Sequence, residues 1–369
     1  MMRRPLPRLD QCCRIVRASL LGCIIALLAS GCGTVARPGK IESRRGDEIV
    51  VAGKFVHTGA SVVLWMDPGG YDAYRVEKRF SPLAESDWEK SKSTFKEVKN
   101  PSPNRYGIRE SVLTAEEIER VRGGGWDLPL LQRVVDQFVY HFDASGTSRQ
   151  CFKVLQDVRD LSVHFMLDLD GTIYQTLDVK ERAWHATTSN GRSVGIEIAN
   201  IGACAPEKTD SLLEWYKTNA LGEVYIKIPE RFEQSGIRTT NFMAKPARHN
   251  PIQGTIQNQE LVQFDFTPEQ YRALIRLTAA LCKVLPKIKC DFPKDDAGNL
   301  RRAKLPDDEL AQYKGLLGHY HIQENKVDPG PAFQWDYVAS EARKLMGGAS
   351  HQATSGNARM QELFNVEAP

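Results

Sequence analysis

The sequence predicts an α/β protein in which a mixed β-sheet is flanked by helices. Two apolar runs at residues 162–168 and 172–177 indicate a hairpin. Alternating apolar residues over 194–199 indicate a further strand with one face in the core. A helix start at Thr267 follows much later. Because strands and helices mix without a regular βαβ rhythm, we expect the sheet to contain both parallel and antiparallel strands.

The first half of the chain is predicted to contain strands, helices and a long surface loop. Residues 48–57 are predicted to begin the ordered part as a strand, whereas the polar residues 85–110 are expected to form a surface loop. Thr114 and Glu117 have the spacing of a capping box that opens a short helix. Phe138–Phe142 is predicted as a strand. Residues 148–158 are predicted as a helix that buries one face, made of Phe152, Leu155 and Val158.

The second half contains the clearest signals. Asp170-Gly171 is predicted as a two-residue turn in the hairpin. At Thr267 the cap is followed by Pro268 at the first helical position and by Gln270, which can bond back to the cap. The buried face of that helix is predicted to consist of Tyr271, Leu274, Ile275, Thr278, Leu281 and Leu285. Residues 332–346 are predicted as a last helix.

Composition changes along the chain indicate its organisation. The predicted parts are a signal segment (1–31), a tether (32–46), an N-terminal extension of unassigned role (47–125), a main domain (126–346) and a flexible tail (347–369). Two polar stretches, about 203–260 and 291–312, are predicted as irregular insertions in the main domain. The sequence leaves open whether the extension packs onto the main domain or lies beside it.

The N-terminus has the features of a secretory signal. Arginines precede an apolar run, Ala18–Ala29, which is shorter than the ~20 residues of a membrane helix. The ending Leu28-Ala-Ser-Gly-Cys32 resembles a bacterial lipobox, in which Cys32 would be acylated. Since Gly33 and not Asp follows the cysteine, the resemblance favours a lipid anchor in the outer membrane, with the protein facing the periplasm. An ordinary signal peptide with an incidental cysteine is the alternative.

Charge and cysteine content narrow the possible functions. The net charge of +3 includes five arginines and one aspartate in residues 1–31, so the rest of the chain is close to −1. We therefore do not expect nucleic acid as a partner, because binding it requires a basic surface. Downstream of Cys32 the cysteines are Cys151, Cys204, Cys282 and Cys290. Cys282 and Cys290 could pair in an exported protein, although spacing does not establish connectivity.

One segment, residues 318–331, concentrates residues that bind metals. His319 and Asp328 offer a nitrogen and an oxygen ligand, both acceptable to zinc. A catalytic zinc site uses three protein ligands and keeps one position open, so a third ligand must come from elsewhere. His141, at the end of a predicted strand, is the best candidate. His321 lies two residues after His319 and is a competing candidate.

Glu197 is the second feature that points to chemistry. In the predicted strand Val194, Ile196 and Ile198 share one face, whereas Gly195, Glu197 and Ala199 share the other. Glu197 thus lies between two small residues, which leave room for a ligand. A structural salt bridge is the alternative explanation for this carboxylate.

These segments together resemble the type 2 N-acetylmuramoyl-L-alanine amidases over roughly residues 130–345. That family includes the AmpD-like and AmiD-like bacterial amidases and is related to phage amidases and peptidoglycan recognition proteins. The resemblance implies the amidase fold, with insertions. The matching blocks, in the order of the family, are Ser162–Phe165, Asp170–Gln175, Arg182–Ala186, Ser193–Glu197 and Gly318–Pro331.

The resemblance also implies roles for individual residues. His141, His319 and Asp328 would be the ligands of Zn²⁺, and Glu197 would be the catalytic acid. Lys326, two positions before Asp328, would stabilise the oxyanion. The implied reaction is hydrolysis of the amide between the lactyl group of muramic acid and L-Ala, in peptidoglycan or a soluble muropeptide.

The chain departs from the family pattern in three places. The loop between His319 and Lys326 is one residue shorter, and His321 stands where the family usually has Asp. Val163 replaces a tyrosine of the phage branch, which places the catalytic role on Glu197. Further candidate substrate-binding residues are His164, Trp184, His185, Asn190 and Asn200. A structural role is the favoured interpretation of His164, and Trp184 could instead pack its own loop.

Other functions remain open at this stage. The main alternative is a non-catalytic peptidoglycan-binding lipoprotein, although such relatives typically lack a zinc ligand and all three candidates are present here. A zinc peptidase that cuts within the stem peptide is a second alternative. The absence of HExxH removes only one type of peptidase. A structural lipoprotein that tethers membrane to wall is a third, and it would show no metal dependence.

Overall fold

The computed structural model describes residues 38–95, 99, 101–232 and 234–347. The predicted signal segment, Cys32 and residues 348–369 of the tail lie outside the described residues. Residues 38–44 belong to a unit of their own and have no regular secondary structure, whereas the chain from residue 45 onward forms one compact unit. Among the described helices, none has the length and apolar character needed to span a membrane.

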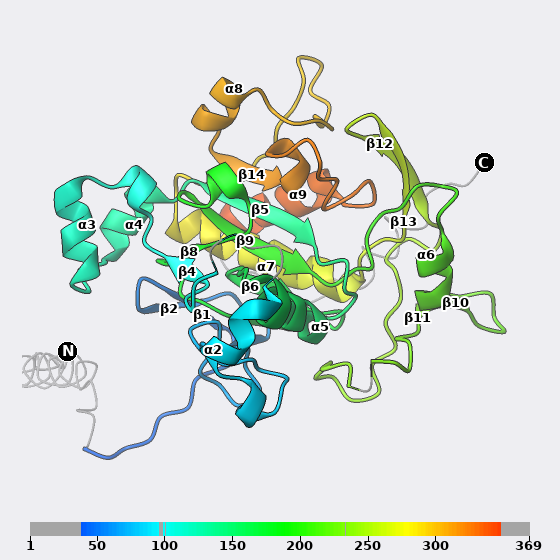
Figure 1. Ribbon diagram of the computed structural model, residues 1–369. Coiled ribbons are helices and arrows are strands. Elements are labelled where there is room, and N and C mark those ends of the chain that lie inside the picture. The colour runs from blue at the N-terminus through cyan, green and yellow to red at the C-terminus, as the bar shows by residue number, and fades with distance from the viewer. Residues whose placement is uncertain (1–37, 96–98, 100, 233, 348–369) are drawn as a thin grey trace, which may run out of the picture. The chain divides into compact units, whose positions relative to one another are not determined.

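A six-stranded mixed sheet forms the centre of the unit that begins at residue 45 (Figure 1). Its order is β14-β5-β9-β6-β7-β3, and every neighbouring pair is parallel except β6 and β7. The predicted α/β class with a mixed sheet and flanking helices is confirmed. The strands are β3 (Val62–Leu64), β5 (Gln137–Phe142), β6 (Phe165–Leu167), β7 (Ile173–Gln175), β9 (Ser193–Ile198) and β14 (Gly315–Gly318).

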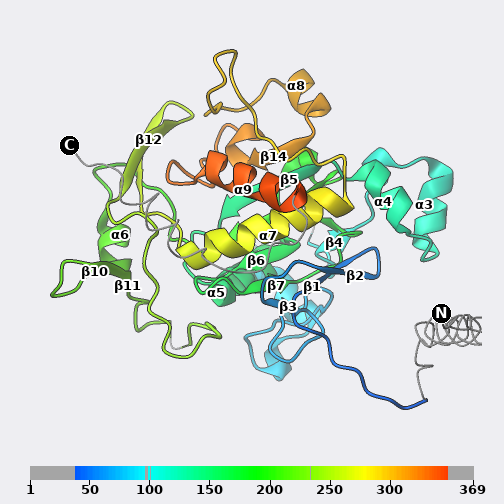
Figure 2. The same cartoon turned by 180° about the vertical axis from the view of Figure 1, so that it is seen from behind.

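Two helices cover one face of this sheet (Figure 2). They are α7 (Pro268–Val284) and α9 (Trp335–Gly347), which correspond to the two helices predicted for this part of the chain. Thr267 and Gln270 form the predicted capping box of α7. Strand residues that point to these helices belong to the main apolar core, among them Phe138, Tyr140, Val194, Ile196 and Ile198. This face is therefore closed by apolar packing.

The opposite face of the sheet carries α5 (Ser148–Phe152), which continues as a π-helix, η4 (Lys153–Arg159). Cys151 and Phe152 pack there against Met166 and Tyr174, whose side chains point away from the α7 face. The single predicted helix at 148–158 is therefore wrong in its second half. Because the π-helix is wound more widely, Gln156 and Asp157 are buried whereas Val158 is exposed.

The N-terminal extension packs onto the main domain and completes its sheet. β3 pairs with β7 in parallel, so it forms one edge of the central sheet. The side chain of Gln175 bonds both the backbone N–H and the carbonyl of Val50. Asp178 accepts hydrogen bonds from the backbone N–H groups of Ala52 and Gly53. These buried polar contacts join the extension to β7 and the residues that follow it.

Several connecting elements differ from the sequence prediction. Residues 48–57 form a hairpin of β1 (Glu48–Val51) and β2 (Lys54–His57), not one strand, since Ala52 and Gly53 adopt the positive φ angles of a turn. Residues 168–172 connect β6 to β7, so the connection is longer than the predicted two-residue turn, and a bond from Asp168 N–H to the Thr172 carbonyl closes it. Residues 85–110 are not simply a surface loop, because Arg105 and Arg109 within them are fully buried.

The predicted insertions contain regular structure. The first carries α6 (Asp210–Trp215), β10 (Tyr216–Thr218), β11 (Val224–Ile226) and β12 (Ile252–Ile256), which pairs with β13 (Gln259–Gln263). The second ends in α8 (Asp307–Gln312). The remaining elements are α2 (Trp88–Ser91), β4 (Tyr106–Gly107), α3 (Ala115–Arg122), α4 (Leu128–Val134), β8 (Arg182–Ala183) and the short helices η1 (Leu83–Glu85), η2 (Lys92–Thr94), η3 (Glu110–Val112), η5 (Thr187–Ser189) and η6 (His319–His321).

The capping box at Thr114 opens α3 as predicted.

Cys151, Cys204, Cys282 and Cys290 are all free thiols. Cys282 and Cys290 are nevertheless hydrogen-bonded neighbours, which raises the pKa of the Cys282 thiol and lowers that of Cys290.

Candidate active site

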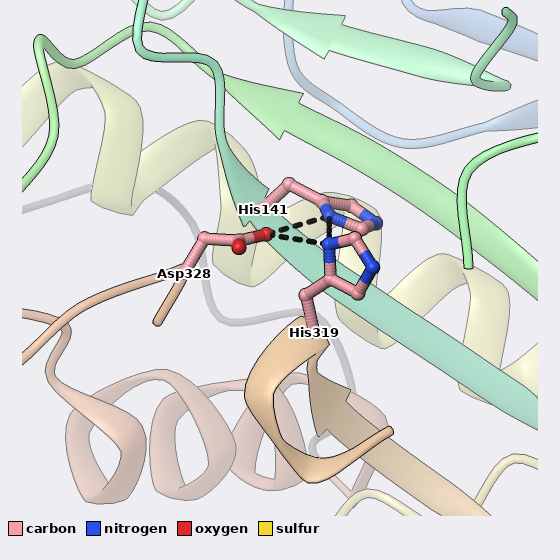
Figure 3. Close-up of side chains that lie close together, drawn as sticks. All are labelled: His141, His319 and Asp328. Atoms are coloured by element: carbon pink, nitrogen blue, oxygen red, sulfur yellow. Dashed lines mark hydrogen bonds and ion pairs between the residues drawn. The ribbon is translucent and has the colours of Figure 1, made fainter. Parts of the chain in front are cut away.

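Three predicted metal ligands from separate segments meet at one end of the sheet (Figure 3). His141 lies near the end of β5, His319 follows β14 directly, and Asp328 lies in the loop beyond η6. The Nδ1 atom of His141 lies 2.7 Å from Asp328 Oδ2 and 3.1 Å from His319 Nδ1. His319 Nδ1 is 3.1 Å from the same carboxylate oxygen. Two nitrogens and one oxygen thus point at a single small volume.

The outer nitrogens of both histidines are held by neighbouring side chains. His319 Nε2 lies 2.6 Å from Gln323 Oε1, an oxygen that can only accept a hydrogen bond. His141 Nε2 lies 3.1 Å from His185 Nδ1. If each Nε2 carries the ring proton, both Nδ1 atoms keep a free lone pair on the side that faces Asp328, where a metal could bind. Such outer contacts orient histidine ligands in metal sites.

Burial and mutual proximity shift the pKa values of these groups. Burial, reinforced by nearby His319, lowers the pKa of His141 to about 4. Burial alone would raise the pKa of Asp328, but the two histidines outweigh this effect and hold it below the ordinary value. The cluster therefore presents a neutral His141 and an ionised carboxylate, the protonation states in which these residues bind metals.

A glycine allows the loop that carries Asp328 to approach β14. A Cβ atom on Gly318 would lie 2.7 Å from Pro329 Cδ and 3.2 Å from the Asp328 carbonyl oxygen. Any larger residue would push the Asp328 segment away from His319. The glycine that precedes His319 thus has a steric role in bringing the two ligands together.

Glu197 and Lys326 line the same pocket as the three candidate ligands. Glu197 lies on β9 directly opposite His141 on β5, since the two residues are register partners in the parallel pair. Lys326 comes from the loop that carries Asp328. The pocket encloses about 430 Å³ and also exposes Trp184, His185, Asn190 and Arg159. The three candidate metal ligands, a carboxyl group and an ammonium group therefore face one shared space.

The environment of Glu197 raises its affinity for a proton. Burial raises the pKa of Glu197 well above its ordinary value, and the charges of Asp328 and Asp143 act in the same direction. Lys326 opposes the shift. A carboxylate with a raised pKa is a stronger base, so Glu197 is suited both to accept a proton and to return it.

The other predicted site residues divide into two groups. Trp184 and His185 line the pocket, as does Asn190. His164 and Asn200 do not line it. The structural interpretation therefore holds for His164, and the assignment of Asn200 as a substrate-binding residue is corrected. Asn200 bonds the backbone of Phe264 and Gly202, so its polar groups are used within the fold. His164 is completely buried behind β9.

His321 is not a ligand of this site. Its Nδ1 accepts a hydrogen bond from Gly318 N–H, and its Nε2 donates one to the Arg301 carbonyl. Both ring nitrogens are therefore satisfied by backbone groups. The site depends on His319, the first histidine of this segment.

Sequence analysis missed three contributors to the site. Gln323 is four residues after His319, a spacing visible in the sequence that could have suggested it. Asp143, which lies two residues after His141, raises the pKa of Glu197 through its charge. Arg109 lies in the extension, where nothing in the local polar sequence indicates a buried role.

Comparison with known proteins identifies the family. Residues 131–331, more than half of the chain, match the N-acetylmuramoyl-L-alanine amidase family. The chain therefore belongs to this family, as its sequence motifs predicted. No curated protein matches the chain.

Solved structures of amidases are similar over much of the chain. An AmpD derivative is 18% identical, with 66% of this chain and 92% of that chain covered and a TM-score of 0.29. AmiD from E. coli, solved with anhydro-N-acetylmuramic acid-L-Ala-D-γ-Glu-L-Lys, is 19% identical, with 62% and 70% covered and a TM-score of 0.31. The endolysin LysCS from Clostridium intestinale is 15% identical, with 58% and 86% covered and a TM-score of 0.29. Since these TM-scores are low, the family assignment rests on the sequence match.

Proposed function

We propose that this protein is a zinc-dependent N-acetylmuramoyl-L-alanine amidase. It would hydrolyse the amide that joins the lactyl group of N-acetylmuramic acid to L-Ala in peptidoglycan or muropeptides. One observation carries the proposal: His141, His319 and Asp328 converge in a pocket that also contains Glu197 and Lys326. Family membership supports the class of reaction.

The three donor atoms suit zinc in type and spacing. Zinc accepts imidazole nitrogen and carboxylate oxygen at about 2.0–2.2 Å in a tetrahedral arrangement, which places ligand atoms about 3.3 Å apart. The observed separations of 2.7–3.1 Å need only a small expansion. A set of three protein ligands also leaves the fourth position open, as in catalytic zinc sites.

Zinc, when bound, would lower the pKa of water toward about 7 and polarise the amide carbonyl. Glu197 takes a proton from the attacking water as the new C–O bond forms. It then gives this proton to the amine nitrogen as the C–N bond breaks, so that L-Ala leaves with a free amino group. General acid–base catalysis of this kind typically contributes about 10²–10⁴-fold to the rate.

Lys326 stabilises the negative charge that develops on the carbonyl oxygen. Its side chain lines the same pocket as Glu197, and it lies in the loop that supplies Asp328. One such donor is worth about 10²–10³ in rate. Trp184, at the rim formed by β8 and the following loop, offers a flat apolar surface on which a sugar ring could pack.

The location that best suits this activity is the cell envelope. We propose that Cys32 carries a lipid after removal of residues 1–31 and anchors the protein in the outer membrane, facing the periplasm. The proposal is supported by the lipobox-like ending Leu28–Cys32 and by Gly33 at the following position. Globomycin sensitivity and metabolic labelling with palmitate would test it. A Cys32→Ala variant that is still labelled would contradict it.

The reaction itself can be tested directly. The soluble form, residues 33–369, is incubated with purified peptidoglycan fragments, with and without a chelator, and the products are analysed by mass. We expect stem peptides that begin with free L-Ala, their loss on chelation and their return with zinc. Fragments that stay bound but intact in the presence of zinc would indicate the non-catalytic binding lipoprotein instead. Cleavage within the stem peptide would indicate a zinc peptidase.

A further inference from the structure

Arg109 is a fully buried arginine from the N-terminal extension, outside the family-matched residues 131–331. Its guanidinium group contacts backbone carbonyls on every side. Nη1 faces three of them along one turn, Nη2 donates to Val179, and Nε donates to Lys180 at 3.3 Å. The three carbonyls contacted by Nη1 belong to Asn190, Gly191 and Ser193, at 3.3, 3.1 and 3.0 Å.

The 190–193 turn, whose carbonyl groups bind Arg109, also fixes the position of His185. Asn190 Oδ1 accepts hydrogen bonds from the backbone N–H groups of His185 (3.0 Å) and Ala186 (2.7 Å). Ser193 Oγ lies 3.2 Å from His185 Nε2. Both the backbone and the ring of His185 are therefore fixed by residues whose carbonyls bind Arg109.

His185 then contacts the candidate metal ligand His141. His141 Nε2 donates to His185 Nδ1 at 3.1 Å, which leaves His141 Nδ1 free for a metal. The ring of His185 lies against the β9 backbone at Gly195, where a Cβ atom would be only 2.5 Å from His185 Nδ1. A continuous set of contacts thus runs from Arg109 through the turn and His185 to His141.

Arg109 also packs, without a hydrogen bond, against His164, which bonds the backbone of β9. His164 Nδ1 accepts a hydrogen bond from Gly195 N–H, so its ring proton is on Nε2, which donates to the Glu181 carbonyl. Arg109 Nη2 lies 3.2 Å from the same Nε2. Burial, with the adjacent charge of Arg109, lowers the pKa of His164 to about 3 and keeps it neutral. Gly195 is two residues from Glu197 on the same strand.

We propose that Arg109 is a positioning residue for the zinc site, acting through the 190–193 turn and His185 on His141. The proposal rests on the proposed zinc amidase function. The N-terminal extension would then support the active site through Arg109, in addition to supplying the edge strand of the sheet.

The cost of burying this arginine supports a positioning role. Burying a cation costs several kcal/mol unless its partners replace water. Among the described residues Arg109 has no ion-pair partner within 4.0 Å and is satisfied by carbonyls that shape one turn. Filling the same volume with an apolar side chain would be cheaper, but it could not hold three carbonyls in one place.

Arg105 provides a matched control, since it is fully buried and comes from the same extension. Its guanidinium contacts the carbonyls of Gln156, Arg75 and Pro103, and its Nε lies 3.4 Å from Asp160. None of these partners contacts a candidate metal ligand. Replacing either arginine should lower the melting temperature, but only the change at Arg109 should alter the metal site.

The experiment compares Arg109→Met and Arg109→Lys with Arg105→Met and Arg105→Lys in the full chain. Zinc affinity is measured by competition with a chromophoric chelator, and the ligand geometry by the visible absorption of the Co²⁺-loaded protein. We expect about 10-fold or greater loss of zinc affinity and a changed cobalt spectrum for Arg109→Met, because outer contacts of metal ligands typically contribute 10–100-fold. The lysine variant should lie between it and the wild type, and the Arg105 variants should bind zinc as the wild type does.

Equal zinc affinities and cobalt spectra for the Arg109 and Arg105 variants would overturn the inference. If Arg109→Met does not fold, Arg109→Lys and Ser193→Ala test the same set of contacts, and wild-type behaviour of both would overturn it equally. A wild-type protein that binds no zinc in this assay would instead contradict the proposed function. The two failures are thus distinguishable.

Discussion

The two faces of the central sheet are built from alternate residues of the same strands, yet only the face opposite α7 and α9 presents polar groups to the pocket. On β9, Val194, Ile196 and Ile198 point into the apolar core beneath α7 and α9. Between them, Gly195 lies against His185 and Glu197 points into the pocket. The comparison shows how a fold separates stability from function: a rigid apolar layer holds the backbone, and the other face of that backbone presents reactive groups in fixed register.

The largest effect is expected from Glu197→Gln, which changes the pocket face and leaves the core face intact. The amide has nearly the same shape but can neither take nor return a proton. We expect kcat to fall by about 10²–10⁴-fold, with zinc content and melting temperature close to the wild type. Steady-state kinetics on a purified muropeptide would measure this. A variant that retains full activity would remove Glu197 from the mechanism.

Lys326→Met should have the next largest effect. It keeps the length of the side chain and removes the charge that stabilises the oxyanion, so kcat should fall by about 10²–10³-fold with a smaller change in KM. Lys314, which lies before β14 and outside the pocket, is a suitable control position for the same substitution. A rise in KM alone would show that Lys326 binds substrate equally in the ground and transition states.

A third prediction concerns Asp168, a buried carboxyl on the α5 side of the sheet. Burial raises its pKa to about 8, so the folded protein keeps a proton that the unfolded chain releases above its ordinary pKa of 3.8. This site therefore makes the folded state less stable as pH rises from about 4 to 8, by up to about 1.4 kcal/mol per pH unit. Asp168→Asn should weaken that dependence. Urea unfolding at pH 5, 6, 7 and 8 would measure it, and an unchanged slope would contradict the prediction.

The smallest effect is expected from Ile196→Val, which changes the core face beside Glu197. Removing one buried methyl group should lower the free energy of unfolding by about 0.5–1.5 kcal/mol. Activity at a temperature well below unfolding should not change, because the side chain points away from the pocket. A large loss of kcat without loss of stability would show that the two faces are coupled more tightly than their packing indicates.

The regular elements were largely predictable because their signals are local. The capping boxes at Thr114 and Thr267 and the alternation over 194–198 depend on neighbouring residues, and each element formed as predicted. The errors occurred where local signals were weak. The π-helix after Phe152 shifts which side chains are buried, and no sequence period predicts where an α-helix widens.

Part of the candidate site could also be predicted from the sequence. The segment 318–331 carries two ligands and Lys326 close together, so composition alone drew attention to it. Linking it to His141 and Glu197 required the resemblance to the amidases. The contact of Arg109 could not be predicted, because it depends on the packing of residues far apart in the chain.

The sequence by itself determined the main strands and helices of the central domain, the family and the residues that can carry chemistry, because these depend on short patterns and residue types. Only the tertiary structure decided that His164 and Asn200 serve the fold, and that β3 extends the sheet. The tertiary structure also decided that Arg109 is buried against backbone carbonyl groups. A buried arginine has no local signature, since its burial depends on carbonyl groups contributed by residues 179–193, far along the chain.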